Sequence, residues 1–396
     1  MKAIQSEYKK SKSPVLYFLL ILTMFYYLAS SYCWIRMYIP KIHYFLVFYN
    51  FVFILYLMTL KNPPSVAKIL KPMILLMLIT AVTTLQEDNI LIALTTFLTY
   101  FPAILLYLLP IERKCQVLSF ITKWFCIIIG ISIVLYVLTF FTSIPNIGTY
   151  KADDDFYPLF RNYLFFIKST NIIETFRFNG PFLEPGHLSI VIAFILFAND
   201  YDFKNNKLLW ILIAALVIGF SLSGWMLTII GWFLLNYQKI NFIPIIIGLA
   251  GFIWISNIYN GGDNLVNSLI LSRLELDDKK GIKGNNRFSK GTDILYDKMV
   301  ENGSVWTGKG SQFKSKNVEG AGYKIYFIRQ GAFMAILVLA FYALLGSYHP
   351  SKKYTISFLL VLCACFLSRG YPNWYSWLLP YVLGTSIYNS PFRLRK

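Results

Sequence analysis

The sequence IHYFLVFYNFVFILYLMTL fills positions 42–60, between Lys41 and Lys61, and contains no Asp, Glu, Lys or Arg. Similar uncharged runs fill positions 13–35 and 90–111. A transmembrane helix needs about 20 mostly apolar residues to cross a hydrocarbon core of roughly 30 Å. These runs therefore predict a protein that crosses a membrane several times.

The composition favours the same class. Charged residues are 14% of the 396 positions and apolar residues are 57%, whereas a soluble domain has about 25% charged residues. We predict one all-α transmembrane bundle over residues 1–396, with about twelve helices. The net charge of +18 does not indicate a nucleic-acid partner, because cytoplasmic loops of membrane proteins collect Lys and Arg.

The cysteines indicate neither a disulfide framework nor a zinc site. All five lie in or beside apolar runs, at Cys33, Cys115, Cys126, Cys363 and Cys365. The acidic run 153–155 is typical of a solvated turn, with a divalent-cation site as the alternative. We predict no metal and no cofactor.

The hydropathy pattern predicts twelve membrane spans. They are 15–35, 42–60, 70–86, 90–110, 118–141, 185–199, 207–221, 224–238, 241–259, 326–346, 354–369 and 372–389. The uncharged run 208–238 is too long for one untilted helix at 1.5 Å per residue. We place a break at 221–224, with one long tilted helix as the alternative.

The charge of the short connecting loops predicts the orientation. If both termini are cytoplasmic, the inner connections and termini carry seventeen Lys and Arg residues, and the short outer connections carry three, which are Arg36, Lys41 and Arg369. Positive residues favour the cytoplasmic side, so we expect both termini inside. Aromatic residues at the predicted outer ends suggest an interfacial belt: Trp34, Tyr38, Trp374, Tyr375 and Trp377.

Two long outer loops, 142–184 and 260–325, are large enough to hold chemistry outside the bilayer. The first ends in RFNGPFLEPGH, residues 177–187, which contains Arg177, Glu184 and His187. A proline after an acid is typical of a helix start, so Glu184 is interpreted either as a helix cap or as part of an anion-binding functional site.

The second loop contains Arg287 and, downstream, the turn Gly308–Gly310 around Lys309. Such a turn either lets the backbone approach a ligand or is an ordinary turn with a solvated lysine; it is not a P-loop, which ends a longer glycine-rich loop in Lys-Ser/Thr. Arg369, at the outer end of a predicted span, is a further candidate. A simple interfacial anchor explains Arg369 equally well.

These motifs together resemble the bacterial O-antigen polymerase and ligase superfamily, which includes the Wzy-type polymerases. The chain is similar in its span number, in its cytoplasmic termini and in its two large outer loops. The segments that carry the resemblance are 177–186, the pattern from Arg287 to Gly310, and 321–331. Two departures stand out. Relatives often have Ser-Arg-Gly where this chain has Ser-Leu-Ser-Gly at 221–224, and ligase relatives carry histidine where this chain has Tyr323 and Lys324.

The resemblance implies a GT-C-like fold and a metal-independent glycosyltransferase that polymerises polyprenyl-diphosphate-linked oligosaccharide repeat units on the outer face of the bacterial inner membrane. The implied partners are lipid-linked substrates, membrane lipids and a chain-length regulator protein. The planar guanidinium group of arginine can donate two hydrogen bonds to phosphate oxygens, so arginines are suited to stabilise a leaving diphosphate. The expected diphosphate ligands are Arg177, Arg287, Lys309 and Arg369, the base is Glu184 or His187, and Tyr323 and Lys324 are further substrate contacts.

Three alternatives remain at this stage. One is a ligase of the same superfamily, against which Tyr323 and Lys324 argue. Another is a lipid-linked oligosaccharide flippase or other transporter, which would need charges within its helices. The third is a non-catalytic membrane scaffold, which would not need arginines clustered at the outer face.

Overall fold

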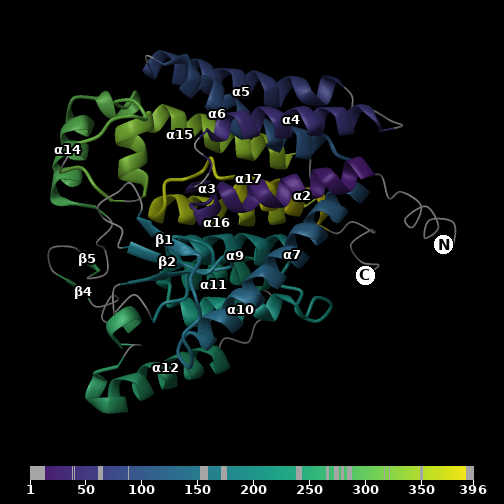
Figure 1. Ribbon diagram of the computed structural model, residues 1–396. Coiled ribbons are helices and arrows are strands. Elements are labelled where there is room, and N and C mark those ends of the chain that lie inside the picture. The colour runs from purple at the N-terminus through teal and green to yellow at the C-terminus, as the bar shows by residue number, and fades with distance from the viewer. Residues whose placement is uncertain are drawn as a thin grey trace.

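The computed structural model (Figure 1) describes most of the chain. The described residues are 14–37, 39, 41–60, 66–87, 89–151, 159–170, 176–237, 243–264, 267–271, 276–277, 281–282, 288–315, 317–320, 322–347 and 351–388. Within them the chain is mostly helical.

A helix lies at each of the twelve predicted segments. They are α2 (Pro14–Ala29), α4 (Ile42–Met58), α5 (Val66–Gln86), α6 (Ile90–Leu108), α7 (Ile111–Leu138), α9 (Pro185–Ala198), α10 (Leu209–Gly219), α11 (Leu222–Asn236), α12 (Ile243–Ile258), α15 (Tyr323–Ser347), α16 (Lys352–Ser368) and α17 (Tyr375–Ile387). Among the described residues, four helical segments are long and apolar enough to cross a membrane: Lys68–Gln86, Ile90–Leu108, Ile111–Leu138 and Tyr323–Gly346. The chain is therefore a helical membrane protein.

The first helix ends earlier than its uncharged run predicts. Helix α2 stops at Ala29, and Tyr32 adopts a left-handed conformation with φ of 51°. The short helix α3 (Trp34–Met37) follows. A non-glycine residue with positive φ interrupts a helix, so hydropathy alone placed the end of this helix too late.

The predicted break in the run 208–238 is confirmed. Helix α10 ends at Gly219, Phe220 is left-handed with φ of 45°, and α11 begins at Leu222. Helix α11 packs closely on α9, because a Cβ at Gly224 would lie only 2.0 Å from Ser189 Cβ. Small residues allow such close helix packing in membranes.

Helix α9 lies at the centre of the bundle, where all of its residues are buried. A helix that is apolar on every side is expected in such a position. Helix α17 packs beside α9, and the Trp377 ring stacks on Phe194 at 5.3 Å. Trp374 and Tyr375 are also buried. The interfacial-belt prediction is therefore wrong for these three residues, which pack inside the protein instead.

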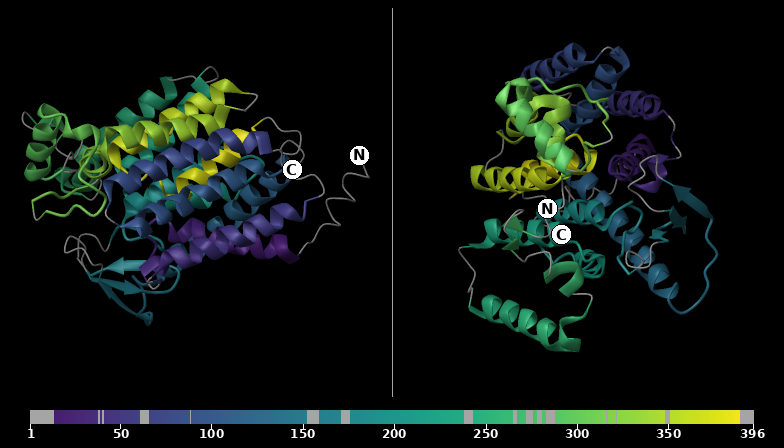
Figure 2. Two further views of the ribbon diagram at one scale, coloured as in Figure 1. Left: turned by 90° about the horizontal axis from the view of Figure 1, so that it is seen from above. Right: turned by 90° about the vertical axis from the view of Figure 1, so that its left-hand side faces the viewer.

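The two long loops lie at the same end of the bundle, whereas α2 begins and α17 ends at the opposite end (Figure 2). The first loop holds an antiparallel sheet of β1 (Gly148–Lys151), β2 (Leu159–Asn162) and β3 (Ile167–Ser169). The second holds the pair β4 (Leu276–Asp277) and β5 (Gly281–Ile282), and then α14 (Lys290–Glu301). The all-α prediction did not include these strands.

Candidate functional site

The segment that carries Glu184 is held against the end of α2. Cys33 and Phe182 form an antiparallel bridge. On either side of it, the Trp34 amide donates to the Pro181 carbonyl at 3.0 Å, and the Leu183 amide donates to the Tyr32 carbonyl at 3.1 Å. These backbone bonds explain why the chain leaves the helical conformation at Tyr32. They also fix the position from which α9 begins.

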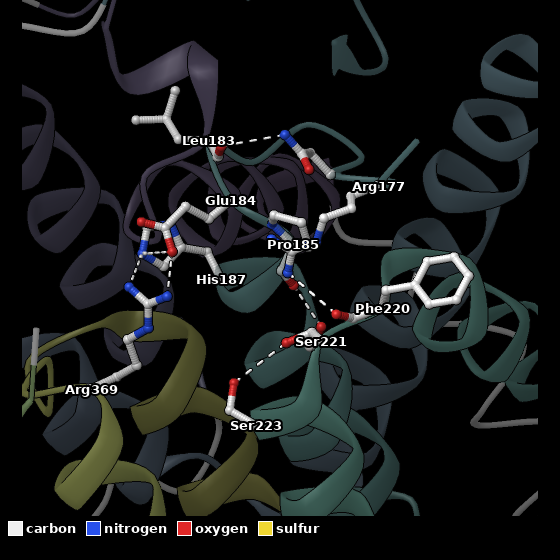
Figure 3. A network of polar contacts seen from close by, with 11 residues as sticks. Arg177, Leu183, Glu184, Pro185, His187, Phe220, Ser221, Ser223 and Arg369 are labelled. Atoms are coloured by element: carbon white, nitrogen blue, oxygen red, sulfur yellow. Dashed lines mark hydrogen bonds and ion pairs between the residues drawn. The ribbon is translucent and has the colours of Figure 1, made fainter. Parts of the chain in front are cut away.

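Glu184 stands directly before α9, with an extended backbone (φ −131°, ψ 148°), and Pro185 is the first helical residue. The Glu184 side chain makes no capping hydrogen bond to α9. Its carboxylate instead forms an ion pair with the Arg369 guanidinium (Figure 3). The helix-cap interpretation therefore explains where Glu184 lies in the chain, but not what its side chain contacts.

Arg369 reaches this site from the end of α16. Its side chain is only 11% exposed, so the interfacial-anchor interpretation does not describe it. Gly370 lets the chain pass close to the start of α15, because a Cβ there would lie 2.7 Å from the Gly322 carbonyl oxygen. The contact between Glu184 and Arg369 joins residues that are 185 positions apart. A partly buried arginine paired in this way is held in a defined direction.

His187 lies one helical turn after Glu184 and is fully buried. Its Nε2 atom is 3.3 Å from Arg369 Nη1 and 4.0 Å from Glu184 Oε2. The Tyr32 ring stacks on the imidazole at 5.4 Å, and the Trp374 ring meets it edge-on at 5.1 Å. The three charged or polar groups therefore meet beside an aromatic wall.

Tyr371 completes the wall by stacking on Trp374 at 4.5 Å. Burial raises the pKa of Tyr371 well above its ordinary value, while the positive charges of Arg369 and Arg329 act against this increase. The phenol therefore stays protonated at neutral pH. It remains able to donate a hydrogen bond.

Sequence reasoning missed most of this wall and the cations near it. Tyr32 and Tyr371 carried no motif, Trp374 was interpreted as interfacial, and Arg36 entered only the charge count. The Arg36 guanidinium lies 5.5 Å from the centre of the Tyr32 ring, and Arg329 is close enough to Tyr371 to lower its pKa. Arg36 lies in none of the motifs, and Arg329 lies in the segment 321–331 that carries the family resemblance but was not selected as a site residue.

Arg177 points in a different direction. Its Nη2 atom donates to the Phe220 carbonyl at 3.3 Å, at the turn between α10 and α11 (Figure 3). In the same turn, the hydroxyls of Ser221 and Ser223 lie 3.3 Å apart. Arg177 and Glu184 are close in sequence, yet Arg177 donates to the turn between α10 and α11 whereas Glu184 pairs with Arg369 at the end of α16.

The turn around Lys309 packs against α15. The Lys309 amide donates to the Ile328 carbonyl at 2.8 Å, and the Gly310 amide donates to the Arg329 carbonyl at 2.9 Å. Gly308 and Gly310 have φ of 71° and 91°, a conformation that favours glycine. The Lys309 side chain is exposed, with its ammonium 5.3 Å from the centre of the Phe313 ring. The glycines thus serve a protein contact.

Tyr323 and Lys324 are the first two residues of α15, and the start of this helix packs against α14. The Lys324 ammonium pairs with the Asp293 carboxylate at 2.7 Å. The Tyr323 ring meets Phe288 edge-on at 5.7 Å. Both side chains therefore help to fix α14 on α15. Arg287 and the acidic run 153–155 lie outside the described residues.

The arrangement can do two things chemically. Glu184 or His187 could accept a proton, and Arg369 could stabilise a developing negative charge beside them.

No family model, no curated protein and no solved structure matches this chain.

Proposed function

We propose that this protein polymerises polyprenyl-diphosphate-linked oligosaccharide repeat units, as in O-antigen, capsule or related surface polysaccharides. The growing glycan leaves its lipid diphosphate and is joined to a hydroxyl of a new lipid-linked unit. The observation that carries this proposal is the cluster of Glu184, His187 and Arg369, which brings a carboxylate, an imidazole and a guanidinium together at the end of the bundle that holds both long loops.

The location of the reaction follows from a proposed topology. Twelve spans, cytoplasmic termini and a GT-C-like architecture would place both long loops outside the bacterial inner membrane. The excess of Lys and Arg in the inner connections supports this orientation. The position of both loops at one end of the bundle, opposite the start of α2, agrees with it. Lipid-linked substrates would then enter the cluster from the outer leaflet.

The reaction needs one proton acceptor and one stabiliser of negative charge. The acceptor hydroxyl forms a bond to the anomeric carbon of the donor, and the bond from that carbon to the phosphate oxygen breaks. The electron pair leaves with the diphosphate, and the hydroxyl proton passes to Glu184 or His187. Arg369 already faces both of these groups, so it can shift towards the phosphate as its charge grows.

Arg177 and Arg287 are proposed as the other diphosphate ligands. The position of Arg177 supports this role, because its side chain lies at the turn between α10 and α11, close to the start of α9. We assign a smaller role in substrate binding to Lys309, Tyr323 and Lys324. Their contacts hold the second loop on α15. In the aromatic wall, Tyr32 and Tyr371 are partly exposed and offer aromatic surface of the kind on which sugar rings pack, with Trp374 buried behind them.

The test is a reaction with purified protein and one defined lipid-linked repeat unit. A polymerase produces a ladder of longer lipid-linked glycans without any other acceptor. A ligase leaves this substrate unchanged until a lipid A core or a protein acceptor is added, and a flippase moves it across a vesicle membrane without lengthening it. Either of the last two results would contradict the proposal.

A further inference from the structure

A polar pocket lies where the segment that follows α7 meets the sheet of the first loop. It has a volume of about 270 Å³ and is lined by residues that follow the end of α7 and by residues of β2 and β3. Five of the lining side chains carry an aliphatic hydroxyl, among them Thr142 and Ser143, and Asn146 adds an amide. This chemistry suits a ligand with several hydroxyl groups. The site around Glu184 uses none of these residues.

Two cations, Arg161 and Lys168, line the same pocket. They are directly paired across β2 and β3, so their side chains leave the sheet on the same face. Like charges placed opposite one another destabilise a sheet. The described residues that line the pocket include no Asp or Glu. An anion between the two cations would offset their repulsion.

Lys168 is held in place by the residues that directly follow α7. Its ammonium lies 4.1 Å from the centre of the Phe140 ring and donates to the Thr139 hydroxyl at 3.0 Å. Burial lowers the pKa of Lys168, and the charge of Arg161 lowers it further. Both effects disfavour the charged form of Lys168, and a bound anion would stabilise that charged form.

The last turns of α7, which lead to this pocket, carry exposed apolar side chains. Val134 and Leu138 are 60% and 41% exposed, and their spacing places them on one face of the helix. Phe141, which follows the end of α7, is 82% exposed. Helix α7 is one of the segments long and apolar enough to cross a membrane. Exposed apolar side chains on such a helix face acyl chains. A lipid whose acyl chain packed on this face of α7 would have its headgroup close to the pocket.

We propose that this pocket binds the headgroup of an anionic glycerophospholipid such as phosphatidylglycerol. The phosphodiester lies between Arg161 and Lys168, and the glycerol hydroxyls contact Thr142, Ser143 and Asn146. One acyl chain follows the exposed face of α7. The site is separate from the proposed polymerisation chemistry and does not depend on it.

A backbone hydrogen bond of β3 connects the pocket to the segment that carries Glu184. The Ile167 amide donates to the Gly180 carbonyl at 2.9 Å, and Gly180 precedes Glu184 in the same segment. A lipid that steadies the pair β2–β3 therefore also steadies the chain that leads to α9. Bound phosphatidylglycerol is expected to raise the temperature at which the protein unfolds.

The test compares phosphatidylglycerol with phosphatidylcholine of the same acyl chains, by native mass spectrometry of the purified full-length protein in a neutral detergent. Wild type is expected to bind phosphatidylglycerol more tightly. The double variant Arg161→Gln/Lys168→Gln should lose roughly 30-fold in phosphatidylglycerol affinity, as expected for two interfacial cations, and should no longer discriminate between the lipids. Lys151→Gln removes a positive charge from the same sheet outside the pocket, and should keep the preference.

Further variants separate loss of binding from loss of folding. Arg161→Lys/Lys168→Arg exchanges the two cations and should retain the preference, whereas Thr142→Trp should remove it by filling the pocket with no change of charge. Equal affinity of wild type for both lipids would overturn the proposal, as would unchanged phosphatidylglycerol affinity in the double variant. Displacement of phosphatidylglycerol by polyprenyl diphosphate at a lower concentration would assign the pocket to the lipid carrier instead. Polymerisation does not enter these measurements, so they stand whether or not the proposed function holds.

Discussion

Gly186 leaves the space through which the Arg369 guanidinium reaches Glu184. A Cβ at position 186 would lie 2.8 Å from Arg369 Nη2 and 3.6 Å from Glu184 Oε2. An alanine at position 186 would therefore make the Arg369 guanidinium shift from its place beside Glu184. Because Gly186 itself carries no reactive group, it allows the geometry of the cluster to be tested without removing any member of it.

Gly186→Ala is expected to displace Arg369 and to reduce polymer formation at least about tenfold, since misplacing a charged group near the chemistry is costly. The protein should still insert and should unfold at a similar temperature. Gly130→Ala is the matched control, because its Cβ would meet Ile211 at an ordinary 3.6 Å. The measurement is the glycan ladder formed per amount of purified protein. A full ladder from Gly186→Ala would contradict a role for the ion pair.

The two arginine substitutions at position 177 test the diphosphate assignment. Arg177→Ala should abolish or strongly reduce the ladder, and Arg177→Lys should restore little of it, because an ammonium cannot reproduce the planar fork. Lys309→Ala should have less than a twofold effect if the Lys309 side chain only contacts Phe313. Near-normal polymer from Arg177→Ala would remove Arg177 from the proposed site.

The proposed topology predicts which positions a membrane-impermeant thiol reagent can reach. In a background without native cysteines, a cysteine at Ile147 or Trp306 should be labelled in intact spheroplasts. Both of these side chains are exposed, at 64% and 55%. A cysteine at Lys352 should be labelled only after permeabilisation. Labelling at Lys352 in intact spheroplasts would invert the orientation.

Gly331→Ala should destabilise the protein. Gly331 has φ of 83°, and a Cβ there would lie 2.4 Å from the Trp306 carbonyl oxygen. Forcing alanine into this conformation costs on the order of 1–3 kcal/mol, and the contact between the Lys309 turn and α15 would also be disturbed. The expected result is a lower thermal unfolding temperature in detergent. Gly251→Ala serves as the control, because nothing lies within 4 Å of its Cβ; equal unfolding temperatures for the two variants would contradict this account.

The sequence predicted the helices better than it predicted their neighbours. Uncharged runs indicate where a chain can cross a membrane, and the break predicted at 221–224 followed from the length of the run 208–238 and the charge that follows it; the structure has it at Phe220. Hydropathy does not indicate, however, whether an apolar helix face will contact lipid or another helix, because lipid and protein interiors are similarly apolar. Trp374 and Trp377 were therefore assigned to an interface, although they pack in the centre.

The candidate site shows the same limit. Glu184, His187 and Arg369 were each selected from their local sequence, but their contact depends on how α9 meets the end of α16. Arg177 was grouped with Glu184 because the two are close in sequence, yet its side chain donates a hydrogen bond to the Phe220 carbonyl in the turn between α10 and α11. Tyr32 and Arg36 could not be selected, since only the bridge between Cys33 and Phe182 brings them to the site.

The last prediction decides which residue accepts the proton. Glu184 is 19% exposed and His187 is fully buried, so an acceptor hydroxyl can approach the carboxylate more easily. Glu184→Gln keeps the shape of the side chain and should reduce the ladder by about 100-fold or more, the range expected for loss of a general base. His187→Gln should reduce it less than tenfold. If Glu184 acts only through the dipole of α9, glutamine should cost about 1 kcal/mol or less and the ladder should persist. A reversed order, with His187→Gln the more severe variant, would assign the proton to the imidazole.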